Sequence, residues 1–248
     1  MKSFLFSAIL FPLLAFTTAS DFKSLQQKET RVKEAYNQKF DDIKTLLKKK
    51  NLDHKKLNIF IRVFKQEKKL EIWAKNSGDK QFFLLKEYAV CRNSGKPGPK
   101  KRQGDLQVPE GFYHIVNFNP QSKFHLSLSI NYPNAYDKAN STAKDLGNNI
   151  CIHGDCVTIG CLPLTDELIK EVYILAVEAY NNGQKQIPVH IFPAKMDDES
   201  FAVLQKDYSD NKALISYWQN IKTGYTYFEK NRSMPKISVS ADGKYAFK

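Results

Sequence analysis

The sequence predicts a mainly β, sandwich-like domain of mixed sheets, with one long helix inside it and helical extensions at both ends. Three observations support this prediction. Between residues 58 and 193, apolar and polar side chains alternate with a period of two in several short runs, as in strands buried on one face. Inside this region, residues 165–180 have the period of a buried helix. The flanking regions, 21–57 and 194–248, are rich in charged residues and have mostly helical periods.

The first twenty residues have the pattern of a secretory signal peptide. Lys2 is followed by an apolar run from Phe4 to Phe16 and then by small residues before Asp21. The apolar run is shorter than the roughly 20 residues that cross a bilayer. We therefore expect a leader at 1–20 and export from the cytoplasm, and we expect no membrane-spanning segment.

The charge balance narrows the classes of partner. The chain has 38 Lys and Arg against 26 Asp and Glu, a formal net charge of +12. A basic exported protein is attracted to anionic envelope polymers or lipid surfaces. Its lysines are scattered among acidic residues and do not form stripes with aromatic residues, so nucleic acid is not an expected partner.

The first half of the chain is predicted to contain a helical arm followed by the first, antiparallel strands of the sheet. Residues 21–57 have apolar side chains at steps of three and four, which predicts an amphipathic helix or pair of helices packed lightly on the domain. Four period-two runs follow, separated by short turns. These predicted strands are 57–64, 69–74, 81–85 and 88–92. Residues 93–107 are a loop rich in Gly, Pro and Lys.

The second half is predicted to alternate short strands with helices. Residues 124–130 form a strand that places His125, Ser127 and Ser129 on one face. A helix begins after Pro163 with Thr165 as its N-cap. The remaining predicted elements are a short buried strand at 150–154, a closing strand at 187–193, and helical segments at 201–208 and 214–228.

The densest cluster of reactive residues lies between Cys151 and Cys161, which reads CIHGDCVTIGC. It contains three of the four cysteines and one of the five histidines. A cysteine nucleophile needs a base to take its proton, and the oxyanion that its attack produces needs backbone N–H donors. We predict Cys161 as the nucleophile, His153 as the general base and acid, and Gly160 as the residue that leaves the oxyanion-binding backbone unobstructed.

The same residues resemble the motif of the YkuD-type L,D-transpeptidases, a His-Gly followed by Ser/Thr-x-Gly-Cys. Here the motif is His153-Gly154 and Thr158-Ile159-Gly160-Cys161, with seven residues between His153 and Cys161. That short gap, and Leu162-Pro163 in place of the usual Val/Ile-Arg, are typical of the YafK-like branch. Residues 108–115 and 221–229 extend the resemblance beyond the motif.

The resemblance implies a YkuD-like fold for residues 58–193. It also implies an enzyme of the periplasm or cell envelope that forms an acyl-enzyme on Cys161 with a peptidoglycan stem peptide. The acyl group then passes to an amine, in transpeptidation, or to water, in a hydrolysis that releases an attached lipoprotein. His125, Tyr132, Gly154 and Thr158 are the candidates for substrate binding, and no cofactor or metal is expected.

An alternative function is a non-catalytic cell-wall-binding domain with a structural zinc site. Its ligands would be Cys151, His153, Cys156 and Cys161. Their spacing does not match a usual finger or ribbon pattern. The sequence therefore favours catalysis over zinc binding.

The cysteines of an exported protein also suggest a disulfide. If Cys161 stays a thiol, one pair can form among the other three cysteines. Cys91 can pair with Cys151 or with Cys156, whereas a bridge from Cys151 to Cys156 would enclose His153 in a tight ring. The choice depends on Cα distances, which the sequence does not contain.

Overall fold

The computed structural model describes residues 21–248. The predicted leader at 1–20 lies outside the described residues. Within 21–248, no helix has both the length and the apolar character that a membrane span requires.

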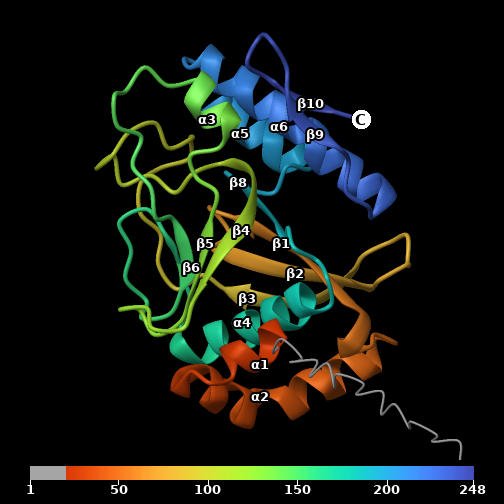
Figure 1. The fold of residues 1–248 in the computed structure, drawn as a ribbon. Coiled ribbons are helices and arrows are strands. Elements are labelled where there is room, and N and C mark those ends of the chain that lie inside the picture. Colours follow the sequence, from red (N-terminus) through yellow and green to blue (C-terminus); the bar gives the residue numbers. More distant parts are fainter. Residues whose placement is uncertain (1–20) are drawn as a thin grey trace, which may run out of the picture.

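The centre of the molecule is one curled sheet of eight strands, in the order β3-β2-β1-β8-β4-β5-β6-β7 (Figure 1). Strands β1, β2 and β3 are antiparallel, as predicted, whereas β1 pairs with β8 and β6 pairs with β7 in parallel. The predicted class, mainly β with helical additions and mixed pairing, is confirmed. The strands are β1 Leu57–Phe64, β2 Lys69–Asn76, β3 Phe83–Ala89, β4 Gly111–Asn119, β5 Ser127–Ile130, β6 Cys151–His153, β7 Leu162–Pro163 and β8 Pro188–Phe192.

Strand β4 connects the two halves of the curled sheet. Its first half, Gly111 to His114, pairs with β8, and its second half, from Ile115 to Asn119, pairs with β5. The register shifts between Ile115 and Asn117, as at a β-bulge, which bends a strand and increases its twist. This curl turns β5, β6 and β7 away from β1, β2 and β3.

Helices cover one face of the sheet. They are α1 (Phe22–Gln26), α2 (Thr30–Lys49) and α4 (Asp166–Asn181), drawn below the sheet in Figure 1. The side chains that α2 buries belong to the main hydrophobic core, and the Tyr36 hydroxyl donates to Glu178 of α4 at 2.7 Å. The expectation of a lightly packed arm is therefore wrong, because α2 supplies part of the core that supports α4.

The C-terminal extension packs against the other side. It contains α5 (Asp198–Asp207), α6 (Lys212–Asn231) and a hairpin of β9 (Ile237–Val239) and β10 (Tyr245–Phe247), and it forms a second core with Trp218 at 0% exposure. Helix α3 (Ala135–Ala139) contacts this core through Tyr136. The two long helices match the predicted helical segments, whereas α3 and the hairpin were not predicted.

A buried carboxylate joins the extension to the loop that precedes β4. Glu110 is fully buried, and its Oε1 accepts from Lys65 Nζ at 2.8 Å and from the Gly98 N–H at 2.6 Å. Its Oε2 accepts from Trp218 Nε1 of α6 at 2.8 Å. Glu110 therefore fixes the position of the Gly-rich loop relative to both β1 and α6.

Two strand boundaries differ from the predicted ones. The predicted runs 81–85 and 88–92 merge into β3, and β5 begins at Ser127 and not at Phe124. His125 has a φ of 66° and lies in a bend before β5, because a left-handed residue interrupts the extended chain. The predicted start of α4 is confirmed, since the Thr165 side chain accepts a hydrogen bond from the Leu168 N–H.

Candidate active site

Cys161, His153 and Thr158 line one cavity of about 490 Å³. The cavity lies between the 153–161 segment and the loop that follows β3. The predicted nucleophile, the predicted base and one of the predicted substrate-binding residues therefore line the same cavity. The other lining residues are Arg92, Lys100, Gln103, Gly104, Leu106, Phe124, Asn148, Asn149, Ile150, Val157, Ile159 and Gly160.

His153 is held in one orientation at the end of β6. Its ring is buried and stacks on Phe124, with ring centroids 4.6 Å apart, and its Nδ1 lies 2.6 Å from the carbonyl oxygen of Gly154. A carbonyl oxygen only accepts, so Nδ1 carries the hydrogen of the neutral ring and Nε2 is the basic nitrogen. Burial lowers the pKa of His153, although the Gly154 carbonyl acts in the opposite direction. The neutral form that a base requires is therefore favoured.

Thr158 organises the turn that presents Cys161. Its Oγ1 accepts from the Gly160 N–H at 3.1 Å and from the Cys161 N–H at 2.8 Å, and it donates to the Cys161 carbonyl at 2.8 Å. The hydroxyl thus supports the turn. It also accepts from the N–H groups of Gly160 and Cys161, at the backbone predicted to bind an oxyanion.

Both motif glycines occupy positions that a side chain would disturb. Gly160 has a φ of 140°, and a Cβ there would lie 3.1 Å from the Gln107 carbonyl. A Cβ on Gly154 would lie 2.5 Å from Asp166 Oδ1 and 3.0 Å from the Phe124 carbonyl. Gly154 therefore lets the start of α4 approach β6, and Gly160 lets the loop before β4 approach the motif.

The sulfur of Cys161 has two close partners. Its Sγ donates to the Asn149 carbonyl at 3.6 Å, and the Cys151 thiol donates to the same carbonyl at 3.4 Å. The neighbouring Cys151 thiol and burial both raise the pKa of Cys161. The nucleophile thus carries its proton until a neighbouring group takes it.

A disulfide joins Cys91 to Cys156, with their Cα atoms 5.7 Å apart, and leaves Cys151 and Cys161 as thiols. The structure thereby selects one of the pairings that the sequence left open. The Cys91 N–H also donates to the Pro163 carbonyl, so the bridge ties the motif to the chain after β3. Cys156 is no longer available as a metal ligand, and residues 21–248 contain no cluster of three or more His, Cys, Asp or Glu arranged for a metal ion.

Three other candidate residues lie outside the cavity lining. His125 lies against Gly154, its Nε2 is buried without a hydrogen-bond partner, and burial lowers its pKa. Tyr132 is buried, and its hydroxyl donates to the Leu146 carbonyl at 3.0 Å. Gly154 donates its N–H to the Phe124 carbonyl at 3.0 Å. Their assignment to substrate binding stays a prediction.

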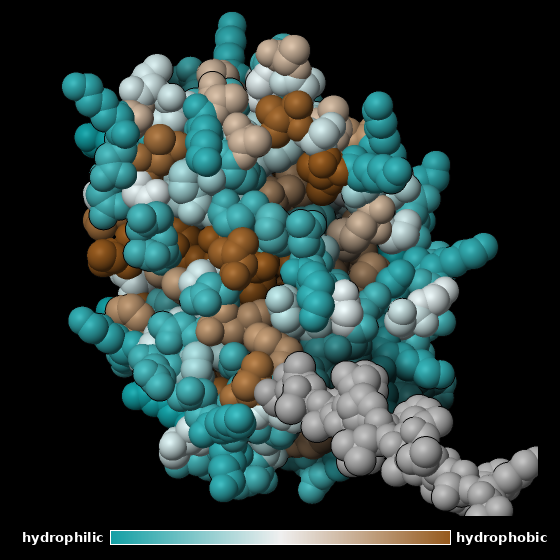
Figure 2. Space-filling view, in the orientation of Figure 1, coloured by the Kyte–Doolittle hydropathy of each residue, from teal (hydrophilic) through white to brown (hydrophobic). Residues whose placement is uncertain are grey.

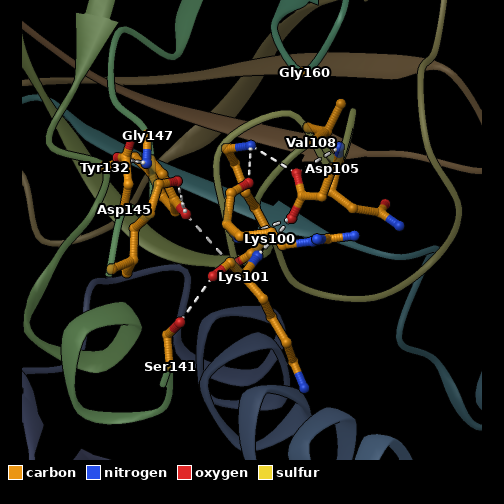
Figure 3. Close-up of polar contacts among 12 residues, drawn as sticks. Lys100, Lys101, Asp105, Val108, Tyr132, Ser141, Asp145, Gly147 and Gly160 are labelled. Atoms are coloured by element: carbon orange, nitrogen blue, oxygen red, sulfur yellow. Dashed lines mark hydrogen bonds and ion pairs between the residues drawn. The ribbon is translucent and has the colours of Figure 1, made fainter. Parts of the chain in front are cut away.

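The loop opposite the motif is held by polar contacts of its own (Figure 3). Lys100 Nζ pairs with Asp105 Oδ1 at 2.6 Å, and Asp105 Oδ2 accepts from the Lys101 N–H at 2.8 Å. The Lys101 carbonyl accepts from Ser141 Oγ at 2.8 Å. The sequence predicts a loop rich in Gly, Pro and Lys here, and these contacts and the Glu110 network give that loop a defined course beside Gly160.

Apolar side chains surround the mouth of the cavity. Figure 2 shows hydrophobic surface gathered at mid-height on the left of the view, over the loops beside β5 and β6. Ile159 is 79% exposed, an unusual degree for an isoleucine. Leu106, Phe124 and Val157 are also exposed large hydrophobic residues that line the cavity. The sequence analysis did not predict these exposed apolar residues at the cavity mouth. The one sign of them in the sequence is that the motif turn contains two apolar residues, whereas its other residues are polar.

The chain is 38% identical over 189 residues to the Escherichia coli K12 protein named "Putative L,D-transpeptidase YafK", and the match covers 75% of this chain and 72% of that protein. The chain belongs to the L,D-transpeptidase family. The YafK protein of Escherichia coli O157:H7 matches this L,D-transpeptidase homologue with the same identity and coverage. No family model matches the chain.

Two solved structures are similar to the chain at lower sequence identity. The helical cell shape determining protein Pgp2 of Campylobacter jejuni is 19% identical to this L,D-transpeptidase homologue, with a TM-score of 0.44 and coverage of 74% of this chain and 73% of that chain. Bd1075 of Bdellovibrio bacteriovorus is 23% identical, with a TM-score of 0.40 and coverage of 70% of this chain and 61% of that chain.

Proposed function

We propose that this protein is a cysteine-dependent enzyme that modifies peptidoglycan in the periplasm or cell envelope. Cys161 attacks a stem-peptide carbonyl, and the resulting acyl-enzyme passes its acyl group to an amine or to water. The observation that supports this most strongly is the joint presence of a free Cys161 and an oriented, neutral His153 on one cavity wall.

Each step has a group in the cavity that suits it. His153 Nε2 takes the proton of Cys161 as the sulfur attacks, and it then gives that proton to the departing amine. The C–S bond forms first, which gives a tetrahedral intermediate, and the C–N bond of the peptide breaks as the intermediate collapses to the thioester. In the second step His153 takes a proton from the incoming amine or water. The attack of an amine gives a transpeptidase, whereas the attack of water releases whatever the stem carried, including an attached lipoprotein.

Charge at the cavity favours this substrate class. The charged residues among the lining are Arg92 and Lys100, both cationic, and Lys100 is already paired with Asp105. A stem peptide carries carboxylates, which cationic side chains attract. The backbone N–H groups of Gly160 and Cys161 already donate to Thr158 Oγ1. For the backbone at Gly160 to bind the oxyanion, one of these N–H groups must therefore break its hydrogen bond to Thr158 as the tetrahedral intermediate forms.

Mass spectrometry tests the nucleophile. The protein is incubated with purified tetrapeptide stems, and an acyl adduct on Cys161 is expected. Cys161→Ala abolishes the adduct and all turnover, and His153→Ala lowers the rate by about 10²- to 10⁴-fold. The control is His54→Ala, which changes a histidine of the 3-10 turn before β1 and keeps full activity. Released products distinguish transfer from hydrolysis. Full activity in Cys161→Ala would refute the proposal.

A further inference from the structure

Large hydrophobic side chains are concentrated around the mouth of the candidate active site. Eight such side chains are exposed within residues 21–248, and four of the eight line the same cavity. These four, named here the apolar rim, are Leu106, Phe124, Val157 and Ile159. Single exposed apolar residues are normal on a protein surface, whereas apolar residues gathered in one patch mark an interaction site. The apolar rim therefore indicates a partner.

The motif turn presents two members of the apolar rim on a rigid support. Val157 is 42% exposed and Ile159 is 79% exposed. Thr158, which lies between them, bonds the backbone of the turn through its hydroxyl. The disulfide at Cys156 fixes the chain immediately before them. Because the turn is already ordered, a partner that covers these side chains does not have to order it.

Leu106, from the loop on the other side of the cavity, is presented in an uncommon backbone conformation. Its φ is 57°, in the left-handed region that bulky residues rarely adopt, and its side chain is 49% exposed. Asp105 holds the backbone in this course, because its Oδ1 accepts from the Gln107 N–H at 3.1 Å and from Lys100 Nζ at 2.6 Å. Residues held in such conformations cluster at functional sites. The outward position of Leu106 is therefore a second indication of a partner.

Cationic side chains border the apolar rim. Arg92 lines the same cavity, and Arg102 and Lys123 each precede a lining residue in the sequence. All three are exposed, and none takes part in the ion pairs found within residues 21–248. The motif turn contributes one exposed acid, Asp155. The border of the apolar rim thus has a positive balance of charge, and Figure 2 shows hydrophilic side chains around this apolar surface.

This combination selects among the partners that an apolar patch could have. Apolar side chains that project from a cationic surface suit an anionic membrane interface, where the apolar groups enter the headgroup region and the cations meet lipid phosphates. A second copy of the chain fits less well, since it would bring the same cations and its own net charge of +12. The charge complementarity therefore favours lipid.

We propose that the apolar rim docks this protein on an anionic lipid surface. Ile159 and Leu106 enter the headgroup region, and the cations of the border lie against lipid phosphates. The mouth of the cavity is then held at the membrane surface, so the cavity receives groups that lie next to the lipid. This inference goes beyond the proposed function and does not depend on the reaction of Cys161.

Co-sedimentation with lipid vesicles tests the docking. One set of vesicles contains phosphatidylcholine and phosphatidylglycerol in equal parts, and the other contains phosphatidylcholine alone. The protein lacks the predicted leader at 1–20, whose apolar run would itself bind lipid, and residues 21–248 contain the whole curled sheet and its cores. The wild type is expected to bind the anionic vesicles at least about tenfold more tightly than the neutral ones, because several cations lie near the surface. Added salt is expected to reduce this difference.

Matched variants assign the binding to the apolar rim. Ile159→Ser is expected to weaken binding to anionic vesicles at least about tenfold, since it removes a large apolar side chain from the interface. Its control, Phe83→Ser, changes a side chain of β3 that is 55% exposed and lies outside the cavity lining, and binding is expected to stay at the wild-type level. Lys123→Gln is expected to weaken binding to anionic vesicles about fivefold, whereas Lys230→Gln, at the end of α6, has no effect. All four positions are exposed, and urea unfolding checks that each variant is folded.

Three results would overturn the proposal. The first is a wild type that does not bind anionic vesicles, or equal losses of binding in Ile159→Ser and Phe83→Ser. The second is a lipid-free dimer in sedimentation velocity that Ile159→Ser dissociates, because the apolar rim would then belong to a second copy. The third is an Ile159→Ser variant that binds vesicles like the wild type but turns over peptide-bearing stems more slowly, because the apolar rim would then receive polypeptide.

Cys161→Ala separates the docking from the proposed function. This variant is expected to lose turnover and to bind vesicles as the wild type does. If it retains turnover, the proposed function fails and the docking is still supported by the vesicle data. If it loses turnover but the wild type does not bind vesicles, the docking alone fails.

Discussion

The Thr158 hydroxyl makes three hydrogen bonds at once, and serine is the only other residue type of similar size that could make the same three. Its hydroxyl accepts from two successive N–H groups and donates to the carbonyl of Cys161. A hydroxyl has two acceptor sites and one donor, so all of its bonding capacity is used. The turn therefore depends on the hydroxyl and not on the shape of the side chain.

Replacing that hydroxyl tests its contribution. Thr158→Val leaves two backbone N–H groups without their acceptor, and each partly buried group left unsatisfied costs about 1 to 3 kcal/mol. We expect turnover of peptidoglycan stems to fall at least about tenfold, a change in activation free energy of about 1.4 kcal/mol. Thr158→Ser retains the hydroxyl and is expected to stay near wild type. Equal rates for both variants and the wild type would show that the turn holds without this group.

Single residues also mark the limit of prediction from sequence. Cys161, His153 and Thr158 were named because their chemistry and spacing are local, and the structure brings them to one cavity. The pairing of Cys91 with Cys156 was not predictable, since 65 positions separate them and their Cα distance is a product of the whole fold. The contact of both Cys151 and Cys161 with the Asn149 carbonyl depends on how the chain folds back on itself, which the sequence does not display.

At the level of elements, period and capping predicted most of the fold. Local alternation of apolar and polar residues was enough to predict β1 and β2. One N-cap residue, Thr165, was enough to predict where the following helix begins. The central place of β8, between β1 and β4, needed long-range pairing and was predicted only as a closing strand. The β9–β10 hairpin has three-residue strands, which are too short for a period to be recognised.

The network around Glu110 predicts a large effect from one substitution. Lys65→Met leaves the Glu110 carboxylate buried without its cationic partner, and breaking such a pair costs about 3 to 5 kcal/mol. We expect a loss of that size in the free energy of unfolding, measured by urea titration. Lys69→Met, at the exposed pair with Glu87, is the matched control and is expected to cost less than about 1 kcal/mol. Similar losses in both variants would contradict the role assigned to Glu110.

For the molecule as a whole, His190 links stability to pH. It lies on β8 between the rings of Phe60 and Phe112, at centroid distances of 4.5 and 4.7 Å. Burial, with a smaller contribution from Arg62, lowers the pKa of His190 to about 3. A histidine of the unfolded chain titrates near 6.5, so the unfolded state binds more protons between these values. The contribution of His190 to stability is therefore complete above pH 6.5 and is lost as the pH falls towards 3.

The expected outcome is a fall in the free energy of unfolding of the wild type through this range, measured by urea titration at a series of pH values. His190→Leu removes the titrating group and is expected to have a smaller fall. The difference between the two proteins isolates His190 from Asp137, whose pKa burial raises to about 6 and whose effect has the opposite sign. Parallel curves for wild type and variant would exclude His190 as a source of acid sensitivity.

The bridge between Cys91 and Cys156 also has a consequence for biosynthesis. A chain made from its N-terminus exposes Cys91 first and Cys151 next, but the native disulfide joins Cys91 to Cys156 and not to Cys151. If disulfides form as fast as the chain emerges, Cys91 pairs first with Cys151. That bond must then be exchanged for one with Cys156, five positions later. Under that condition, a cell that produces this protein needs a catalyst of disulfide exchange as well as an oxidant. The yield of active protein is expected to depend on how early in synthesis the oxidant acts.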